Sequence, residues 1–155
     1  DIIDRKFATT TELEEIQIVD FLNAQNIDNN TVAEVLNLIE NISFSKEISS
    51  VCPKLKILQD ADRLDAMGAI GIARAFSYGG FKKRAFYNPE ETPKLNMTKE
   101  EYKKSQSTTI NHFYEKLLTL KDGMNTETAK KIAEKRHNFM LLFLEQFENE
   151  WNKFD

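Results

Sequence analysis

Little in this sequence supports a disulfide-stapled, β-rich or membrane-spanning protein. The chain has one cysteine, Cys52, so it cannot form an internal disulfide, and this usage fits a reducing cytoplasm. Five glycines and three prolines among 155 residues leave little room for the frequent turns of a β fold. No apolar run approaches the roughly 20 residues that cross a bilayer. These absences predict a cytoplasmic protein that is helical and makes no membrane contact.

Charge of neither sign dominates the chain. The formal net charge is −4, and the charged residues, 30% of the total, are spread along the sequence. A DNA- or RNA-binding protein usually carries a basic face, so no polymeric nucleic acid is expected as a partner. A small anionic substrate stays compatible with this balance, because a metal ion or a local basic pocket can supply positive charge.

The apolar content predicts one packed domain. Hydrophobic residues make up 41% of the chain, and eleven phenylalanines offer large surfaces for burial. A length of 155 residues suits a single domain over residues 1–155. The sequence begins with Asp1 and has neither an initiator methionine nor the basic region of a signal peptide. We therefore expect this domain to be N-terminally incomplete, cut from a longer protein.

Hydrophobic periodicity indicates an all-α fold of about five helices and no strand. The predicted helices span residues 12–25, 31–42, 54–78, 98–121 and 126–151, with a loop over 81–97. Pro53 suits the first turn of the third helix. Thr98, with Glu100 or Glu101, suits a capping box at the start of the fourth. Thr126 is expected to start the last helix.

The third predicted helix, which ends at the Gly79-Gly80 pair, carries unusual residues. Gly68 and Gly71 lie inside it, although glycine costs about 0.5–1 kcal/mol relative to alanine in a helix. Two such glycines indicate that another part of the protein packs close to this backbone, which makes the helix central. The helix also carries Asp60, Asp62 and Asp65. Asp62 and Asp65 share a face because they are three residues apart, whereas Asp60 points elsewhere.

Carboxylates on a mostly apolar helix need partners, because a buried unpaired charge is costly. Two kinds of partner are compatible with the residues. One is a salt bridge to Arg63, Arg74 or a lysine, and the other is a divalent metal. Composition alone favours the salt bridge.

Residues 60–66 (DADRLDA), with the Gly- and Ala-rich continuation to Tyr78-Gly79-Gly80, resemble the distal metal-ligand helix of HD-domain phosphohydrolases. They are most similar to a bacterial subgroup of small HD nucleotide pyrophosphohydrolases. Residues 42–46 (ISFSK), 112–117 (HFYEKL) and the pair Arg136-His137 extend the resemblance over essentially the whole chain. The resemblance implies an HD-domain-like helical bundle.

The resemblance also implies a metal site. The superfamily binds its metal through a histidine, a His-Asp pair and a distant aspartate. Asp62 matches the distant aspartate and Asp1 matches the aspartate of the pair, which places both histidines before Asp1. Asp4 matches the acidic residue that orients or deprotonates the attacking water, and Lys6 lies where it could reach a phosphate. Asp65 is expected to be a supporting or structural residue, not a ligand.

Several basic residues follow the aspartates. Arg63, Arg74 and Arg84 are candidates for binding substrate phosphates, because guanidinium forks match phosphate oxygens. The alternative for Arg63 is a structural ion pair within its helix. Lys82 and Lys83 fit a phosphate clamp and a solvated basic loop equally well.

The implied activity is metal-dependent cleavage of a nucleoside triphosphate to a monophosphate and pyrophosphate. Mn²⁺ is the expected cofactor, with Mg²⁺, Ni²⁺ and Fe²⁺ as other options. His112 and His137 are expected to be partly buried structural residues. Two other functions stay open: an HD enzyme acting on nucleotide monophosphates or cyclic dinucleotides, and a metal-free helical module that binds a protein partner. A homodimer is also compatible with the sequence.

Overall fold

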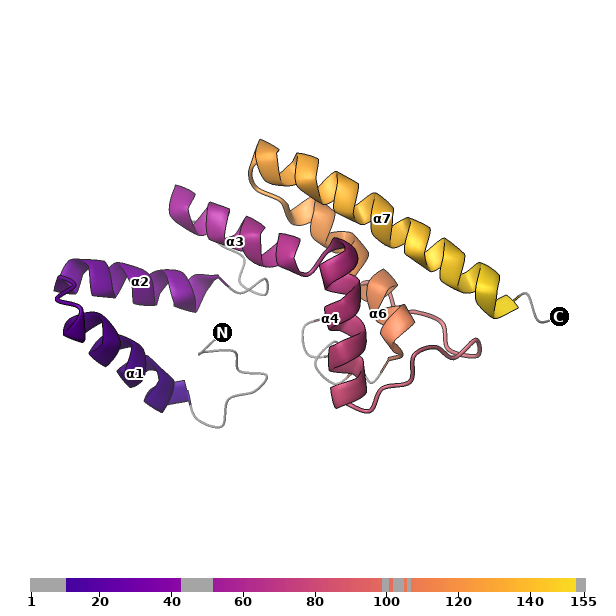
Figure 1. Cartoon of the computed structure of the whole chain (residues 1–155), viewed down its shortest axis with the longest axis horizontal. Coiled ribbons are helices and arrows are strands. Elements are labelled where there is room, and N and C mark those ends of the chain that lie inside the picture. Colours follow the sequence, from indigo (N-terminus) through magenta and orange to yellow (C-terminus); the bar gives the residue numbers. More distant parts are fainter. Residues whose placement is uncertain (1–10, 43–51, 99–100, 102–104, 106, 153–155) are drawn as a thin grey trace. The chain divides into compact units, whose positions relative to one another are not determined.

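The computed structural model describes residues 11–42, 52–98, 101, 105 and 107–152, with side chains from residue 17 onwards. The chain divides into two compact units, residues 1–48 and 49–155. Every regular element described is helical (Figure 1), which confirms the all-α prediction. In the described ranges, no helix combines the length and the apolar content needed to span a bilayer. The single-domain assignment stays a prediction.

The first unit is a pair of contacting helices, α1 (Thr11–Ala24) and α2 (Asn29–Asn41). Asp28 caps α2, because its carboxylate accepts hydrogen bonds from the backbone N–H groups of Asn30 and Thr31, each at 3.0 Å. The Thr31 hydroxyl donates to the same carboxylate at 2.6 Å. A side-chain acceptor of this kind satisfies N–H groups that the helix itself leaves unpaired. Both helices lie close to their predicted ranges.

The second unit holds the remaining elements. These are α3 (Pro53–Asp65), α4 (Gly68–Phe81), α6 (Thr109–Glu115), the 3₁₀ helix η1 (Leu117–Gly123) and α7 (Glu127–Asn152). The longest of them, α7, contacts α3, α4 and η1. Pro53 begins α3 as predicted, and the Thr126 hydroxyl accepts from the backbone N–H of Ala129 at 3.2 Å at the start of α7.

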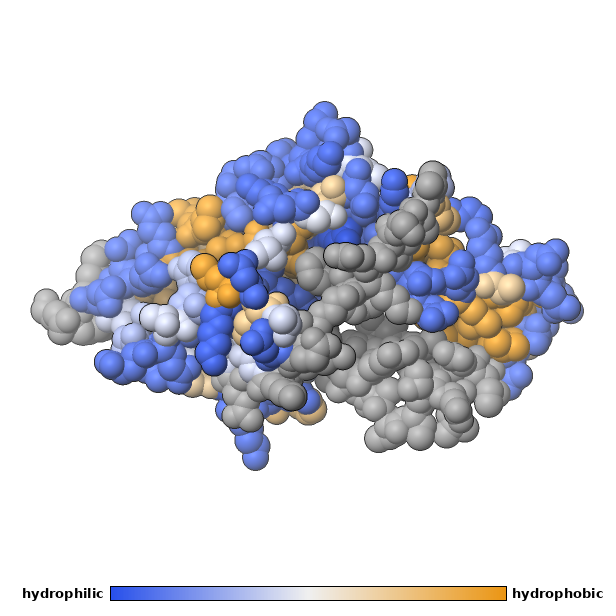
Figure 2. Space-filling model, turned by 180° about the vertical axis from the view of Figure 1, so that it is seen from behind, coloured by the Kyte–Doolittle hydropathy of each residue, from blue (hydrophilic) through white to orange (hydrophobic). Residues whose placement is uncertain are grey.

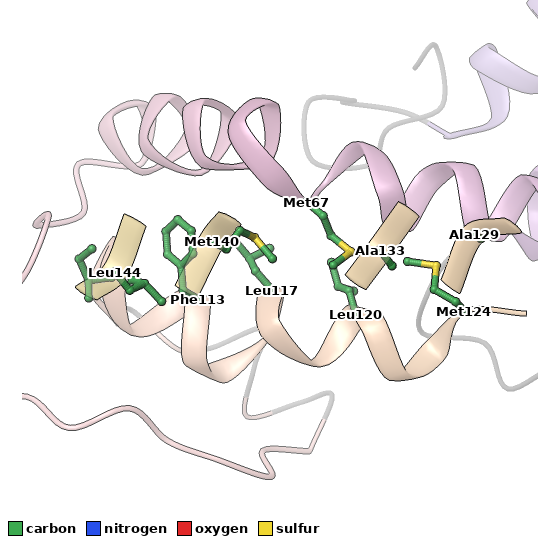
Figure 3. Close-up of a cluster of buried hydrophobic side chains, with 10 residues drawn as sticks. Met67, Phe113, Leu117, Leu120, Met124, Ala129, Ala133, Met140 and Leu144 are labelled. Atoms are coloured by element: carbon green, nitrogen blue, oxygen red, sulfur yellow. The ribbon is translucent and has the colours of Figure 1, made fainter. Parts of the chain in front are cut away.

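The core of the second unit lies between α7, α6, η1 and the corner that joins α3 to α4. Figure 3 shows this cluster, in which Met67 projects from the α3–α4 corner towards the side chains of η1 and α7. The buried members are Met67, Ile110, Phe113, Leu117, Leu120, Met124, Ala129, Ala133, Met140 and Leu144. Apolar surface also reaches the exterior, where hydrophilic side chains divide it into patches (Figure 2).

The single helix predicted over residues 54–78 is wrong, because the chain turns a corner at Ala66 and Met67. Met67 is only 1% exposed, so the corner inserts this side chain into the core. Gly68 has φ +71°, a conformation that glycine adopts at little cost. A Cβ at Gly71 would collide with the carbonyl oxygen of Ala66. The close backbone approach predicted from the glycines is therefore confirmed.

The Gly79-Gly80 pair does not end α4, which continues to Phe81. Gly79 is buried within the helix, and a Cβ there would collide with the hydroxyl of Thr109 at the start of α6. This glycine permits close packing of two helices and is not a stop signal.

The long helix predicted over residues 98–121 is also wrong. The predicted capping box is present: the Glu101 carboxylate accepts from the Thr98 backbone N–H at 2.8 Å, and the Thr98 hydroxyl accepts from the Glu101 N–H at 3.3 Å. A separate helix, α6, begins at Thr109, and Lys116, with φ −144°, interrupts the path before η1. The change of direction allows Leu117, which is 5% exposed, to enter the core.

Candidate functional site

The three aspartates of α3 lie within two turns of one helix but have different surroundings. Asp60 is 3% exposed, whereas Asp62 and Asp65 are both exposed. Their partners decide which of the three carboxylates is available to a ligand.

Asp60 binds the segment that leads into α7. Its carboxylate accepts from the backbone N–H of Asn125 at 2.7 Å, from the Asn125 side-chain amide at 3.0 Å and from the Thr126 N–H at 2.8 Å. Burial alone would raise the pKa of Asp60, but the hydrogen bonds from Asn125 and Thr126 outweigh burial and hold the pKa below its ordinary value. The Arg63 guanidinium lies 3.6 Å away. Asp60 is therefore an ionised cap for α7.

Sequence reasoning did not assign this role to Asp60. The available signal was its place on the apolar stripe of α3, five residues after Leu55 and four before Leu64. A carboxylate on such a stripe must be paired when it is buried. Its partners, Asn125 and Thr126, are 65 and 66 residues away along the chain, so no local pattern identifies them.

Asp65 forms an ion pair with Arg74 of α4. The same guanidinium lies 3.4 Å from the backbone carbonyl oxygen of Asp65. The two side chains are 60% and 55% exposed, so the pair lies at the surface. Of the two kinds of partner predicted for the aspartates, a salt bridge or a metal, Asp65 has the salt bridge. This ion pair holds Arg74 beside the end of α3.

Asp62 is exposed and has no hydrogen-bond or ion-pair partner among the residues that the structure describes. The two arginines considered as its partners are placed otherwise, since Arg63 faces Asp60 and Arg74 pairs with Asp65. Asp62 lies one turn before Asp65, so its carboxylate is close to the end of α3 where Arg74 is held. Within the described ranges, no group of three or more His, Cys, Asp or Glu side chains could hold a metal ion.

The corner between α3 and α4 is tied to α7 by Arg136. Its guanidinium donates to the carbonyl oxygen of Leu64, and its Cγ lies 3.0 Å from the place a Cβ would occupy at Gly68. One side chain of α7 thus contacts the last turn of α3 and the first residue of α4. The arrangement fixes the helix that carries Asp62 relative to the helix that carries Arg74.

The other predicted phosphate-binding arginines are placed differently. The side chain of Arg63 is 11% exposed and lies beside Asp60. Arg84 follows the far end of α4, where its guanidinium carbon lies 5.9 Å from the centre of the Tyr78 ring. The amine of Lys82 lies 5.7 Å from the same ring. Because α4 has 14 residues, and a helix rises 1.5 Å per residue, this end is roughly 20 Å along the helix from the corner near Asp62.

Asp1, Asp4 and Lys6 lie outside the described residues. His112 and His137 are both half-buried, as expected, and their structural role stays a prediction. The Nδ1 atom of His137 is buried and has no hydrogen-bond partner in the part of the chain that the structure describes.

No family model matches the sequence. The chain is 38% identical over 156 residues to the uncharacterised protein YpgQ of Bacillus subtilis, a match that covers 97% of this chain and 67% of YpgQ.

Solved structures are also similar. A protein of Lactobacillus plantarum is 40% identical with a TM-score of 0.81, and the match covers 94% of this chain and 70% of that one. Bacillus subtilis YpgQ in complex with ADP is 35% identical with a TM-score of 0.76, over 100% and 73% of the two chains. An HD-superfamily hydrolase of Bacillus thuringiensis is 42% identical with a TM-score of 0.69, over 93% and 65%. The chain thus spans about two thirds of the length of these relatives, and it belongs to the HD-domain superfamily.

Proposed function

We propose that this protein is a metal-dependent nucleotide phosphohydrolase that releases pyrophosphate from a nucleoside triphosphate. The observation that carries the proposal is the exposed carboxylate of Asp62, which has no partner in the described residues, while Asp60 and Asp65 on the same helix are both paired. An HD-superfamily hydrolase among the relatives and the binding of ADP by YpgQ support this choice of substrate class.

Asp62 is suited to be one of several ligands of the metal. Its carboxylate is accessible and pairs with no cation of the described residues, which suits a position at the edge of a metal site. We propose Asp1 as a second ligand, and the two histidines of the superfamily's ligand set would complete the site. Imidazole and carboxylate together suit Mn²⁺, which we propose over Mg²⁺, Ni²⁺ and Fe²⁺. Such a metal lowers the pKa of a bound water and polarises a phosphoryl oxygen.

The chain's own residues orient the reactants. Asp4 is proposed to hold the attacking water and to accept its proton, which requires hydrogen-bond distance. Arg74 and Lys6 are proposed to neutralise charge on the phosphates. Asp65 supports this role, because its ion pair holds Arg74 beside the end of α3. Within this proposal Arg63 supports Asp60, and Arg84 does not reach the reacting phosphates.

The test compares Asp62→Asn with Asp65→Asn in the full-length protein. Both substitutions remove one exposed carboxylate from the same helix. Asp65→Asn also breaks the ion pair with Arg74, so Mn²⁺ affinity, and not turnover alone, separates the proposed ligand role of Asp62 from the supporting role of Asp65. Wild-type protein incubated with Mn²⁺ and a panel of nucleoside triphosphates should yield monophosphate and pyrophosphate, separated by anion-exchange chromatography. Asp62→Asn should lower turnover and Mn²⁺ affinity by more than about 100-fold, whereas Asp65→Asn should retain Mn²⁺ binding in calorimetry.

Two results would overturn the proposal. One is metal-dependent turnover by Asp62→Asn that equals the wild-type rate, and the other is no turnover of any nucleotide with any divalent metal. Cleavage of monophosphates or cyclic dinucleotides instead of triphosphates would assign a different reaction to the same site.

A further inference from the structure

Helix α3 is attached to α7 at two points, and Asp62 lies between them. Two residues before it, the Asp60 carboxylate accepts a hydrogen bond from the Thr126 N–H at 2.8 Å. Two residues after it, the carbonyl oxygen of Leu64 accepts a hydrogen bond from the guanidinium of Arg136. The chain is therefore held on both sides of the proposed metal ligand.

The two attachments determine the direction in which Asp62 points. Each residue turns a helix by about 100°, so Asp60 and Leu64 share one face of α3 and Asp62 lies on the opposite face. Asp60 is 3% exposed and the side chain of Leu64 packs against the core, whereas Asp62 is exposed. The face that binds α7 thus directs Asp62 away from α7.

A small rotation of α3 would misplace this carboxylate. With the side chain about 6 Å from the helix axis, a rotation of about 10° moves it by roughly 1 Å. A ligand-binding group must be held within about 0.5 Å of its productive position. The attachment of α3 is therefore important for any metal that Asp62 binds.

Arg136 can limit this rotation because it holds the last turn of α3. The carbonyl groups of a last turn lack intrahelical partners, and a cation there is favoured by the helix dipole. Arg136 is half-buried and forms no ion pair within the ranges that the structure describes. Its positive charge faces the end of α3 instead of a carboxylate.

The same side chain also contacts α4. The Cγ and Cβ atoms of Arg136 lie 3.0 and 3.2 Å from the place that a Cβ would occupy at Gly68, the first residue of α4. Arg74 follows on α4, and Asp65 at the end of α3 holds its guanidinium. One side chain of α7 therefore fixes both the helix of the proposed metal ligand and the helix of the proposed phosphate-binding arginine.

We infer that Arg136 is a positioning residue of the nucleotide site, which sets the directions of Asp62 and Arg74 without contacting metal or nucleotide itself. The inference rests on the proposed function. Loss of the guanidinium should weaken the binding of metal and of nucleotide together, although the substitution lies on a different helix from both residues. A clamp that serves stability alone would leave both binding constants unchanged.

The first experiment measures Mn²⁺ affinity by calorimetry of the full-length protein without nucleotide. Arg136→Met removes the donor but keeps an aliphatic stem over Gly68, and it should lower the affinity by about ten-fold. Arg136→Lys keeps a donor of similar reach and should return the affinity to within about three-fold of wild type. Lys135→Met removes the same charge from the neighbouring exposed position and should have no effect.

Leu144→Ala controls for a loss of stability alone. Leu144 is 2% exposed and lies eight residues beyond Arg136 on α7, or about 12 Å along the helix. The cavity should lower the thermal unfolding midpoint at least as much as Arg136→Met does, while Mn²⁺ affinity stays within about two-fold of wild type. All titrations are made well below the midpoint of the least stable variant.

The second experiment measures KM for the nucleoside triphosphate at saturating Mn²⁺ in two backgrounds. Arg136→Met should raise KM by about three-fold or more when Arg74 is present. In the Arg74→Ala background the same substitution should leave KM nearly unchanged, because Arg136 acts on the nucleotide through Arg74.

Each result either supports the inference or rejects it. Arg136→Met that binds Mn²⁺ as tightly as a binding-competent wild type would overturn the inference and leave the proposed function intact. Equal losses of affinity in Arg136→Met and Leu144→Ala, or equal rises of KM in both backgrounds, would reject it as well. Wild-type protein that neither binds Mn²⁺ nor cleaves a nucleotide would instead overturn the proposed function, and the inference with it.

Discussion

Asp60, Asp62 and Asp65 carry the same functional group, yet the structure places them in three different environments. Asp60 is buried and caps α7, and Asp65 holds Arg74 at the surface. Asp62 is exposed and has no partner in the described part of the chain. From sequence, Asp62 is predicted to be a metal ligand only through the resemblance to a family, because spacing on a helix does not reveal distant partners such as Asn125.

The position of Arg74 leads to a prediction about nucleotide binding. Its guanidinium is positioned by Asp65 close to the turn that carries Asp62, where it could contact a phosphate of the nucleotide. Arg74→Ala should therefore raise KM for the nucleoside triphosphate by about ten-fold while leaving Mn²⁺ affinity nearly unchanged. Steady-state kinetics and calorimetry measure the two quantities separately.

Lys82→Ala is the matched control, since Lys82 is a basic residue at the other end of α4. It should leave KM unchanged. An equal rise in KM for both variants would indicate a general electrostatic attraction and not a specific contact by Arg74.

The glycines of α4 show how much element boundaries depend on tertiary packing. Gly68 and Gly71 allow the corner after α3, Gly79 allows contact with Thr109, and only Gly80 has open space around the position of a Cβ. The presence of these glycines predicted close packing correctly. The positions of the glycines in the sequence did not distinguish a corner from a contact between two helices. The break at Met67 was therefore missed, and the end of the helix was wrongly placed at Gly79.

These different environments predict opposite effects of the same substitution. Gly71→Ala should lower the free energy of unfolding by at least about 2 kcal/mol, because the new Cβ would collide with the carbonyl oxygen of Ala66. Gly80→Ala should raise it by up to about 0.8 kcal/mol, because alanine is the better helix former and nothing obstructs its Cβ. Urea unfolding of both variants measures the difference. Stabilisation by Gly71→Ala would contradict the tight corner described here.

Where local signals agreed with packing, the elements were predicted well. Pro53 and Thr126 mark helix starts that the structure contains, and the hydrogen bonds of the Thr98–Glu101 capping box are formed as predicted. The helix expected over 98–121 failed in two places: Ser107 and Thr108 are not helical, so α6 begins anew at Thr109, and Lys116, although lysine is a good helix former, lies at a second break. That break is set by the burial of Leu117 and its neighbours in the core, which depends on residues distant in sequence.

The free energy of unfolding of the protein should depend on pH at both the acidic and the alkaline end of the range. Hydrogen bonds hold the pKa of Asp60 below its usual value of about 3.9, so the unfolded chain binds a proton more readily. Stability contributed by Asp60 is therefore fully present above about pH 4 and is lost as pH falls through its folded pKa.

Tyr114 contributes to the pH dependence of stability at alkaline pH. Burial, followed by the hydrogen bond that its hydroxyl donates to Glu148 at 2.8 Å, raises the pKa of Tyr114 to about 12. The unfolded phenol ionises near pH 10, so this contribution is present below about pH 10 and is lost as pH rises towards 12.

Urea unfolding monitored by the fluorescence of Trp151 gives the free energy of unfolding at each pH. The acid limb is its decline at low pH, and the alkaline limb is its decline at high pH. Asp60→Asn should lower stability at neutral pH and flatten the acid limb, while Tyr114→Phe should flatten only the alkaline limb. An acid limb that keeps its wild-type slope in Asp60→Asn would show that another carboxylate is responsible.

The corner clamped by Arg136 also constrains how the length of this chain can change. Only Ala66 and Met67 separate α3 from α4, and each residue of a helix turns its successors by about 100°. One inserted residue at the corner would rotate α4 so that Arg74 faced away from Asp65 and Gly79 away from Thr109. A residue inserted in the exposed stretch around Pro89 would disturb neither contact. Insertions and deletions among related proteins should therefore collect in that stretch and be absent between Asp65 and Gly68.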